Sequence, residues 1–129
     1  MLTIYGIFLV LHGLVHFWPA TLTWRLVEFK PEMGWTGASF VLSRVLEEST
    51  VLTLAGVLFP LAGILFVISG IGVAMHADWA RWLLTVSAVF SSLVLVLYWD
   101  GSTQMLVQKG LIGLVINVLV LVGLARQIP

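Results

Sequence analysis

The chain opens with a long apolar run, LTIYGIFLVLHGLVHFW, which covers residues 2–18. A helix of this length can cross a hydrocarbon core of roughly 30 Å at about 1.5 Å per residue. Two ionisable rings, His12 and His16, lie inside the run. Because residues four apart share one face of a helix, both rings are predicted to point the same way, with Tyr5 on the same line. The run therefore predicts a membrane span with polar groups on one face.

The composition extends this prediction to the whole chain. Of its 129 residues, 60% are hydrophobic and only 9% are charged, whereas soluble domains carry about a quarter charged residues. Six basic and six acidic residues cancel, so no basic surface indicates nucleic acid as a partner. The lack of cysteine excludes disulfides and thiolate metal ligands. We expect the lipid bilayer as the principal partner.

Four apolar runs predict an all-α, polytopic membrane protein, folded as an antiparallel four-helix transmembrane bundle. The predicted spans are 2–19, 50–75, 79–99 and 109–126. No repeat or linker divides the chain, so residues 1–129 form one predicted domain. Tryptophans near the ends of the runs fit the headgroup regions of a bilayer.

The segment 20–49 is the main extramembrane stretch, because it holds most of the charges. Its second part predicts a short amphipathic helix lying on the membrane between the first two spans. The alternative is that this helix continues into the second span. The apolar residues at helical spacing are Ala38, Val41, Leu42, Val45 and Leu46.

Three glycines in the second span, Gly56, Gly63 and Gly70, are spaced seven residues apart. They form one line along the helix, where a neighbouring backbone can approach closely. This line predicts self-association or packing against other membrane subunits. Gly72 lies off the line and is expected to tolerate a larger side chain better than Gly63.

The two histidines are candidate metal ligands. If four antiparallel spans thread the bilayer, His16 lies on the side where several carboxylates gather, and His12 and Asn117 lie near mid-depth. Nitrogen and oxygen ligands suit zinc or non-haem iron. The alternative is that the histidines are ordinary polar residues bonded to backbone carbonyls or serines. The candidate metal set is His12, His16, Glu47, Glu48 and Asp100, and the candidate residues for orienting a bound group are Tyr98 and Asn117.

A polar stripe on the third span has a simpler interpretation. Ser87, Ser91 and Tyr98 return to nearly the same angle of a helix. We expect them to make hydrogen bonds between helices.

Short motifs also resemble those of a known family. The His-Gly-x-x-His at 12–16, the Trp-Asp-Gly at 99–101 and Asn117 in the fourth run resemble a family of small four-span prokaryotic membrane proteins of uncharacterised function. The resemblance covers most of the chain. It implies the four-span architecture and a prokaryotic cytoplasmic membrane, and it supplies no activity.

The basic residues favour one orientation in the membrane. Four of them flank the side of segment 20–49, whereas Arg81 and Arg126 lie on the other side. Cytoplasmic loops carry an excess of Lys and Arg, so segment 20–49 is expected to face the cytoplasm. The four are Arg25, Lys30, Arg44 and Lys109.

Three functions are compatible with these features. The leading interpretation is a non-enzymatic accessory, assembly or interaction subunit in the membrane. The alternative is a metal- or cofactor-binding membrane protein, enzymatic or not, that uses His12 and His16 with the carboxylates. The third is a small dimeric transporter, disfavoured because no acidic residue lies in the middle of a predicted span.

Overall fold

The structure is a computed structural model, and it describes residues 2–18, 21, 24, 39, 41–99 and 111–126. Over these residues the fold is all-α, as predicted. Two helices, α3 and α4, are long and apolar enough to cross a membrane. The α-helices are α1 (Leu2–Val15), α3 (Glu48–Ala74), α4 (Ala80–Leu97) and α5 (Leu111–Ala125), and a 3-10 helix, η2, covers Leu42–Arg44.

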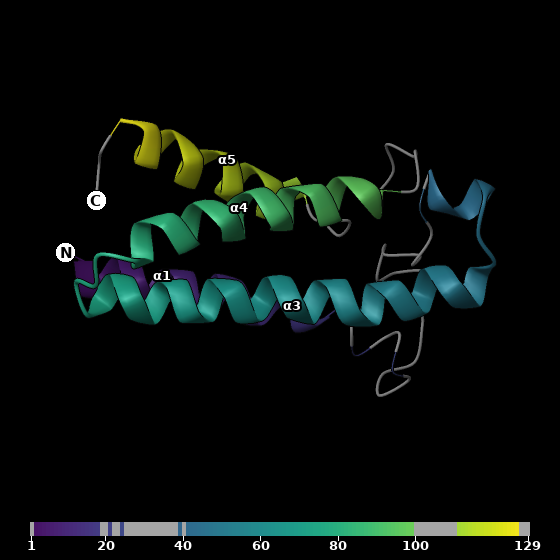
Figure 1. The fold of residues 1–129 in the computed structure, drawn as a ribbon, viewed down its shortest axis with the longest axis horizontal. Helices are drawn as coiled ribbons and strands as arrows, with labels where there is room; N and C mark the ends of the chain where they lie inside the picture. Colours follow the sequence, from purple (N-terminus) through teal and green to yellow (C-terminus); the bar gives the residue numbers. More distant parts are fainter. Residues whose placement is uncertain are drawn as a thin grey trace.

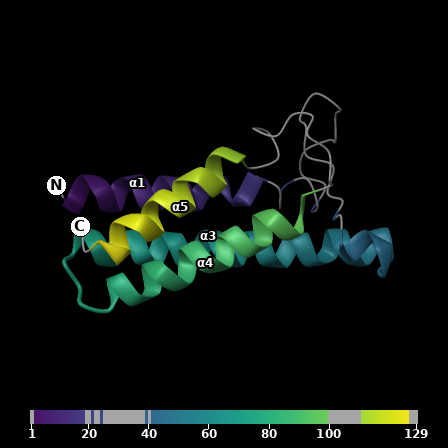
Figure 2. The same ribbon diagram turned by 90° about the horizontal axis from the view of Figure 1, so that it is seen from above.

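The helices lie side by side, with α1 and α4 both against α3 and with α5 against α4 (Figures 1 and 2). The N-terminus, the C-terminal end of α5 and the connection between α3 and α4 lie at one end of the molecule, here called the hairpin end (Figure 1). One buried apolar cluster draws on all four α-helices. Its members are Leu9, Phe66, Leu84, Ala88 and Val120.

Glycines bring α1 and α3 into backbone contact. A Cβ atom added to Gly63 would lie 2.7 Å from the carbonyl oxygen of Gly13, and one added to Gly70 would lie 2.6 Å from that of Gly6. Only residues without side chains allow such an approach. The predicted glycine line therefore packs within the chain, and Gly63 and Gly70 are covered by α1 rather than free for a second subunit.

The expectation that Gly72 tolerates a larger side chain better than Gly63 stays a prediction, although Gly72 is closely surrounded too. A Cβ atom at this position would lie 2.6 Å from Cη2 of Trp79 and 2.9 Å from Cβ of Ala80. The close turn from α3 into α4 folds the Trp79 ring over Gly72, and helical periodicity alone does not predict this contact. A side chain at Gly72 would meet side-chain atoms of Trp79 and Ala80, whereas a side chain at Gly63 would meet the backbone carbonyl of Gly13.

The turn between α3 and α4 is a Schellman motif centred on His76. The backbone N–H of His76 donates to the carbonyl of Val73 (3.1 Å), and that of Ala77 donates to the carbonyl of Gly72 (2.9 Å). His76 has a φ of 58°, in the left-handed region where this motif usually has glycine. The motif reverses the chain and makes α3 and α4 an antiparallel hairpin.

The predicted amphipathic helix is replaced by the three-residue η2. The hydroxyl oxygen of Ser39 accepts from the backbone N–H of Leu42 (2.9 Å) and donates to the carbonyl of Leu97 (2.5 Å). Serine side chains that bond to nearby backbone compete with regular helix. Glu47 is extended, with a ψ of 151°. The helix therefore also does not continue into α3.

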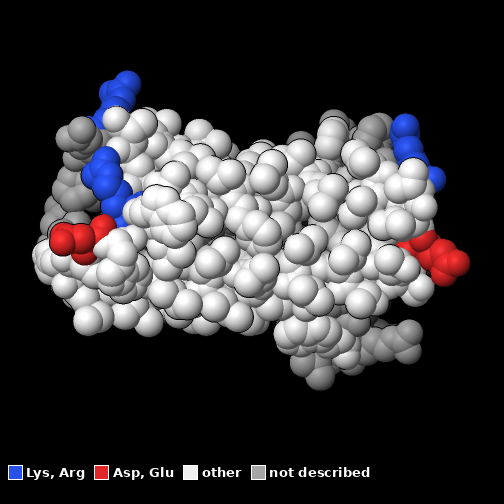
Figure 3. Space-filling view, in the orientation of Figure 1, with Lys and Arg blue, Asp and Glu red and all other residues white. Residues whose placement is uncertain are grey.

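Charge and apolar surface are separated along the molecule. The charged residues of the described part lie near its two ends, and the band between them is uncharged (Figure 3). Large apolar side chains are exposed along this band, for example Ile4 (71%), Val57 (58%), Leu93 (65%) and Leu119 (64%). Exposed apolar area of this extent indicates a surface that does not face water.

Candidate polar network

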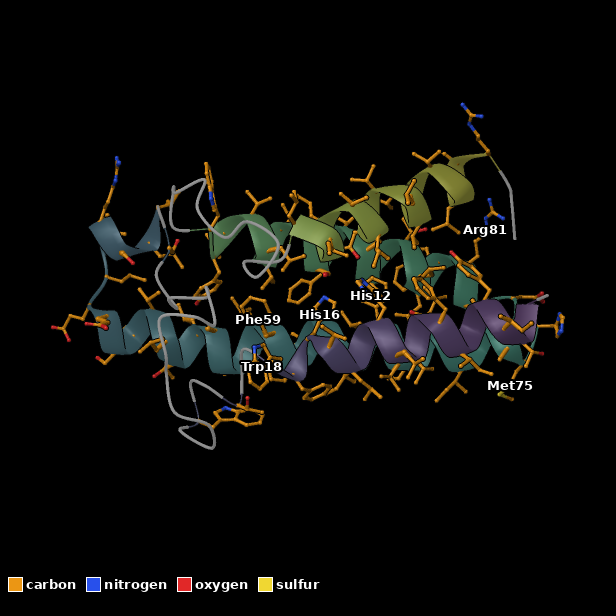
Figure 4. The ribbon with its side chains drawn as sticks, turned by 180° about the vertical axis from the view of Figure 1, so that it is seen from behind. His12, His16, Trp18, Phe59, Met75 and Arg81 are labelled. Carbon is orange, nitrogen blue, oxygen red and sulfur yellow. The ribbon has the colours of Figure 1, made fainter. Side chains whose placement is uncertain are left out.

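Four polar side chains meet inside the helices, and we call them the polar network. His12 and His16 come from α1 and the turn that follows it, Ser91 comes from α4, and Asn117 comes from α5. The two histidines are 7% and 5% exposed, and Ser91 and Asn117 are fully buried. In Figure 4 both histidine rings point from α1 into the space between the helices.

His16 lies at an interruption of the first helical run. The predicted span extended to residue 19; α1 ends at Val15, His16 is a turn residue, and Phe17 and Trp18 are helical again. The backbone N–H of His16 donates to the carbonyl of Gly13 (3.1 Å), which is a tighter turn than the α-helix makes. The side chain of His16 still folds back on α1, where its Nδ1 lies 2.9 Å from the carbonyl oxygen of His12.

The network is a chain of four hydrogen bonds. His12 Nε2 lies 2.9 Å from Asn117 Oδ1, and Asn117 Nδ2 donates to Ser91 Oγ at 2.9 Å. Ser91 Oγ lies 2.5 Å from His16 Nε2. The bond from His16 to the carbonyl of His12 then closes the ring of contacts. The network therefore ties α1, α4 and α5 together at one level.

The chemistry of the acceptors fixes where the hydrogens lie. A carbonyl oxygen only accepts, so His16 Nδ1 carries a hydrogen, and its Nε2, in a neutral ring, accepts from the Ser91 hydroxyl. The Asn117 amide oxygen likewise accepts from a hydrogen on His12 Nε2. With both rings neutral, every bond has one donor and one acceptor. The network therefore requires opposite tautomers in the two histidines.

The orientation of the Asn117 amide follows from the same reasoning. If oxygen and nitrogen were exchanged, Ser91 would have to donate to Asn117. His16 would then have to donate from both of its nitrogens and would carry a positive charge. A buried cation with no partner is costly. The orientation in the structure avoids that charge.

Ser91 is unlike the other serines and threonines in these helices. Its hydroxyl serves His16 and Asn117. The other hydroxyls described with a helical hydrogen bond lie within 3.0 Å of the carbonyl oxygen four residues earlier, and they are Thr53, Ser69, Thr85, Ser87 and Ser92. Ser69 and Ser87 also bond to each other, so one of these two hydroxyls donates to the neighbouring helix instead of to its own carbonyl. Ser91 thus acts as a link between helices rather than as a local partner of its own backbone.

Phe66 closes the network on the side of α3. Its ring centroid lies 4.7 Å from that of His12, edge to face, and 5.5 Å from that of His16. Gly113 of α5 approaches from another side, where a Cβ atom would lie 3.9 Å from His12 Cε1. All four α-helices therefore contribute to the surroundings of the two rings.

The structure does not bring Glu47 and Glu48 to the histidines. Both glutamates are exposed. Glu48 precedes Phe66 by 18 residues of α3, which at about 1.5 Å of rise per residue separates them by ~27 Å along the helix. Asp100 lies outside the described residues. Glu47 and Glu48 do not approach His16, because α3 extends far beyond the end of α1.

A metal site at the histidines thus stays a prediction. Among the residues that the structure describes, no group of three or more His, Asp or Glu side chains could hold a metal ion. Both nitrogens of His16 and Nε2 of His12 already have hydrogen-bond partners. A zinc or iron ion bound there would have to displace Ser91 or Asn117.

Of the two residues predicted to orient a bound group, only Asn117 contacts the histidines. Tyr98 instead donates its hydroxyl hydrogen to the carbonyl of Val51 (2.6 Å) and packs on Phe59, with ring centroids 5.5 Å apart. Ser87 bonds to Ser69 at 2.9 Å. The polar stripe on α4 therefore makes hydrogen bonds between helices, as predicted.

Sequence reasoning identified all four members of the network but not their connection. Ser91 was placed on the polar stripe, and Asn117 was placed at the depth of His12. The sequence does not predict the order of the helices around the core, and this order brings Ser91 between Asn117 and His16. The matching depth of the four residues was the available signal.

Comparisons with known proteins add no assignment. No protein-family model, curated protein or solved structure matches this chain. The resemblance based on His12, His16, Trp99 and Asn117 therefore stays a prediction, and the function is inferred from the geometry.

Proposed function

We propose that the chain is an integral membrane protein that crosses the bilayer four times and acts as a non-enzymatic accessory or assembly subunit. The observation that carries the proposal is the closed polar network inside an exposed apolar band. Polar side chains that bond to one another between apolar helices stabilise helix packing in membranes. In the described helices, the buried side chains of His12, His16, Ser69, Ser87, Ser91 and Asn117 are bonded in this way.

The lengths of the helices support a membrane location. With 27 and 18 residues, α3 and α4 are apolar enough to cross a bilayer. The apolar helices α1 and α5 have 14 and 15 residues, which gives each about 22 Å of a core that is about 30 Å thick. Four spans therefore require a few flanking residues of α1 and α5 to extend the crossing.

The depth of the network supports the same arrangement. Ser91 follows the start of α4 by 11 residues, and His12 follows the start of α1 by ten. Both helices start at the hairpin end, so the network lies about 15 Å from that end, half the thickness of a hydrocarbon core. Glu47 and Glu48 then protrude on the far side, where water can solvate them.

The proposed location is the cytoplasmic membrane of a prokaryotic cell, with segment 20–49 in the cytoplasm. The chain has no cysteine, so a thiol reagent can react only with a cysteine that is introduced by substitution. Val45 and Met75 are 75% and 71% exposed, and they lie just before the start and just after the end of α3. An impermeant thiol reagent added to intact cells is expected to label Met75→Cys and to spare Val45→Cys. The opposite pattern reverses the orientation, and equal labelling of both contradicts an odd number of crossings between them.

An accessory or assembly role predicts a stable complex in native membranes. The chain, tagged and expressed at its natural level, is extracted into polymer-bounded lipid discs, and the size and protein content of the particles are measured. We expect a second protein, or a second copy, in a constant ratio to the chain. Cells without the tagged chain provide the control. Particles that hold a single chain and no constant partner contradict the role.

Metal analysis distinguishes a metal-binding protein from the proposed accessory subunit. Untagged protein is purified without chelators, and zinc and iron are measured per chain. Near-stoichiometric metal in the wild type that is lost in both His12→Gln and His16→Gln contradicts the closed network. Metal-free protein of full stability agrees with it.

A further inference from the structure

Two arginines come together at the hairpin end, where the end of α5 meets the start of α4. Arg81, the second residue of α4, donates from its guanidinium to the carbonyl oxygen of Leu124 in the last turn of α5. The carbonyls of a last helical turn lack partners within the helix and attract a cation. Arg126 follows Leu124 by two residues. The bond to Leu124 therefore holds the Arg81 guanidinium at the part of the chain that carries Arg126 (Figure 4).

Neither arginine has a carboxylate partner in the part of the chain that the structure describes. Asp78, in the connection between α3 and α4, is the described acidic residue at this end, and it forms no ion pair with them. Two arginines against one aspartate leave an excess of positive charge. A guanidinium has five N–H groups in a planar fork, and the bond to Leu124 uses a single nitrogen of Arg81. Donors therefore remain for an anion.

Two tryptophans indicate that this end lies at the level of lipid headgroups. Trp79 and Trp82 stand on either side of Arg81 in the sequence, and their side chains are 51% and 71% exposed. Exposed tryptophan is typical of the layer between the hydrocarbon core and water. Toward the middle of the molecule the surface is apolar and uncharged (Figure 3). A phospholipid can therefore place its acyl chains on this apolar band and its phosphate at the arginines.

We propose that Arg81 and Arg126 form a binding site for the phosphate of an anionic phospholipid. The site rests on the membrane location proposed above, and it adds the class of lipid that the chain selects. Arginine suits this ligand, because its planar fork can donate two parallel hydrogen bonds to phosphate oxygens.

The bond to Leu124 prepares Arg81 for the ligand. A side chain that is already held in place loses less freedom when a ligand binds, so more of the interaction appears as affinity. The described bond of Arg126 is made by its backbone N–H, to the carbonyl of Val122. Its side chain can therefore turn toward a phosphate that is bound at Arg81.

The charge of the headgroup determines which lipid is favoured. A zwitterionic headgroup such as phosphocholine carries its own cation beside the phosphate, and two guanidinium groups repel that cation. A phosphatidylglycerol headgroup carries the phosphate charge with hydroxyl groups and no cation. Basic residues at a membrane surface attract such anionic lipids. Asp78 opposes the attraction with one charge, which the two arginines outweigh.

Native mass spectrometry of the full chain tests the site. The chain is released from neutral detergent micelles that hold equal amounts of phosphatidylglycerol and phosphatidylcholine with the same acyl chains, and the retained lipids are counted. We expect retained phosphatidylglycerol to exceed retained phosphatidylcholine severalfold. Arg81→Gln and Arg126→Gln should each bring this ratio close to one. Arg44→Gln removes the same charge from η2, away from the hairpin end, and should keep the wild-type ratio.

Arg126→Gln is the decisive variant, because in the described part of the chain its side chain makes no hydrogen bond or ion pair. It tests the site even if Arg81→Gln loosens α5. Equal retention of the two lipids by the wild type, or the wild-type ratio in Arg126→Gln, contradicts the site.

Two further measurements separate the source of the phosphate and the membrane location. Inorganic phosphate at millimolar concentration should not displace phosphatidylglycerol, and displacement would contradict a lipid site in favour of a free phosphate. A wild-type chain that stays in solution without detergent contradicts the membrane location itself. A chain that needs detergent but retains both lipids equally contradicts the lipid site alone.

Discussion

At the scale of single residues, Ser91 links the two halves of the polar network. It accepts from Asn117 and donates to His16, and its neighbour Ser92 bonds only to its own helix, at the carbonyl of Ala88. Two adjacent serines on one helix therefore differ in their hydrogen bonds: Ser91 bonds to two other helices, and Ser92 bonds within its own helix. The difference predicts unequal effects of the same substitution.

Ser91→Ala is expected to lower the free energy of unfolding by about 2 kcal/mol, because it leaves a donor of Asn117 and an acceptor of His16 buried without a partner. Ser92→Ala should cost less than about 0.5 kcal/mol, because its carbonyl partner keeps the helical hydrogen bond. Thermal unfolding of both variants in the same nanodiscs measures the difference. Equal losses would mean that Ser91 does not link the helices.

His76 offers a stabilising substitution. Its φ of 58° is unfavourable for a residue with a Cβ atom. His76→Gly is expected to raise the free energy of unfolding by about 0.5–1 kcal/mol, since glycine adopts this conformation without strain. His76→Ala keeps the Cβ atom and should give no gain. If His76→Ala raised the free energy of unfolding as much as His76→Gly, the gain would come from removing the imidazole and not from relieving backbone strain.

At the scale of helices, the glycine contacts between α1 and α3 set the closest packing in the fold. A Cβ atom at Gly63 would meet backbone, the Gly13 carbonyl at 2.7 Å, whereas one at Gly113 would meet Leu95 Cδ1 at 3.4 Å. A backbone atom moves only if the whole helix moves. A methyl group at the end of a leucine moves easily.

Gly63→Ala is therefore expected to cost about 1–3 kcal/mol, because α1 must shift away from α3. Gly113→Ala should be neutral or stabilise by up to about 1 kcal/mol, because alanine favours helix over glycine. Thermal unfolding of the two variants provides the comparison. A loss for Gly113→Ala that equals the loss for Gly63→Ala would remove the close contact as the cause.

Helices were more predictable than their contacts. The apolar runs predicted α3 and α4 to within a few residues, because length and composition decide such helices. The spacing of Gly63 and Gly70 predicted a close backbone contact, but not that α1 of the same chain makes it. The segment around Leu42 was predicted as a helix from its apolar spacing, which ignores the competing hydrogen bonds of Ser39.

At the scale of the whole molecule, charge lies at the two ends and the network lies between them (Figures 3 and 4). The sequence predicted this separation, since charged residues interrupt only the ends of the apolar runs. It also predicted that His12 and Asn117 share a depth. It could not predict that Glu48 stands so far from His16, because that distance depends on how far α3 extends past α1.

The central claim is that one closed hydrogen-bond network joins α1, α4 and α5, and histidine nitrogen NMR tests it most directly. The full chain is labelled with ¹⁵N in its histidines and measured in lipid bilayers at pH 7.5, with His12→Gln and His76→Gln used to assign the three rings. The network predicts two neutral rings of opposite tautomer, with the hydrogen on Nε2 in His12 and on Nδ1 in His16. Two rings of the same tautomer, or a charged ring at this pH, would contradict it.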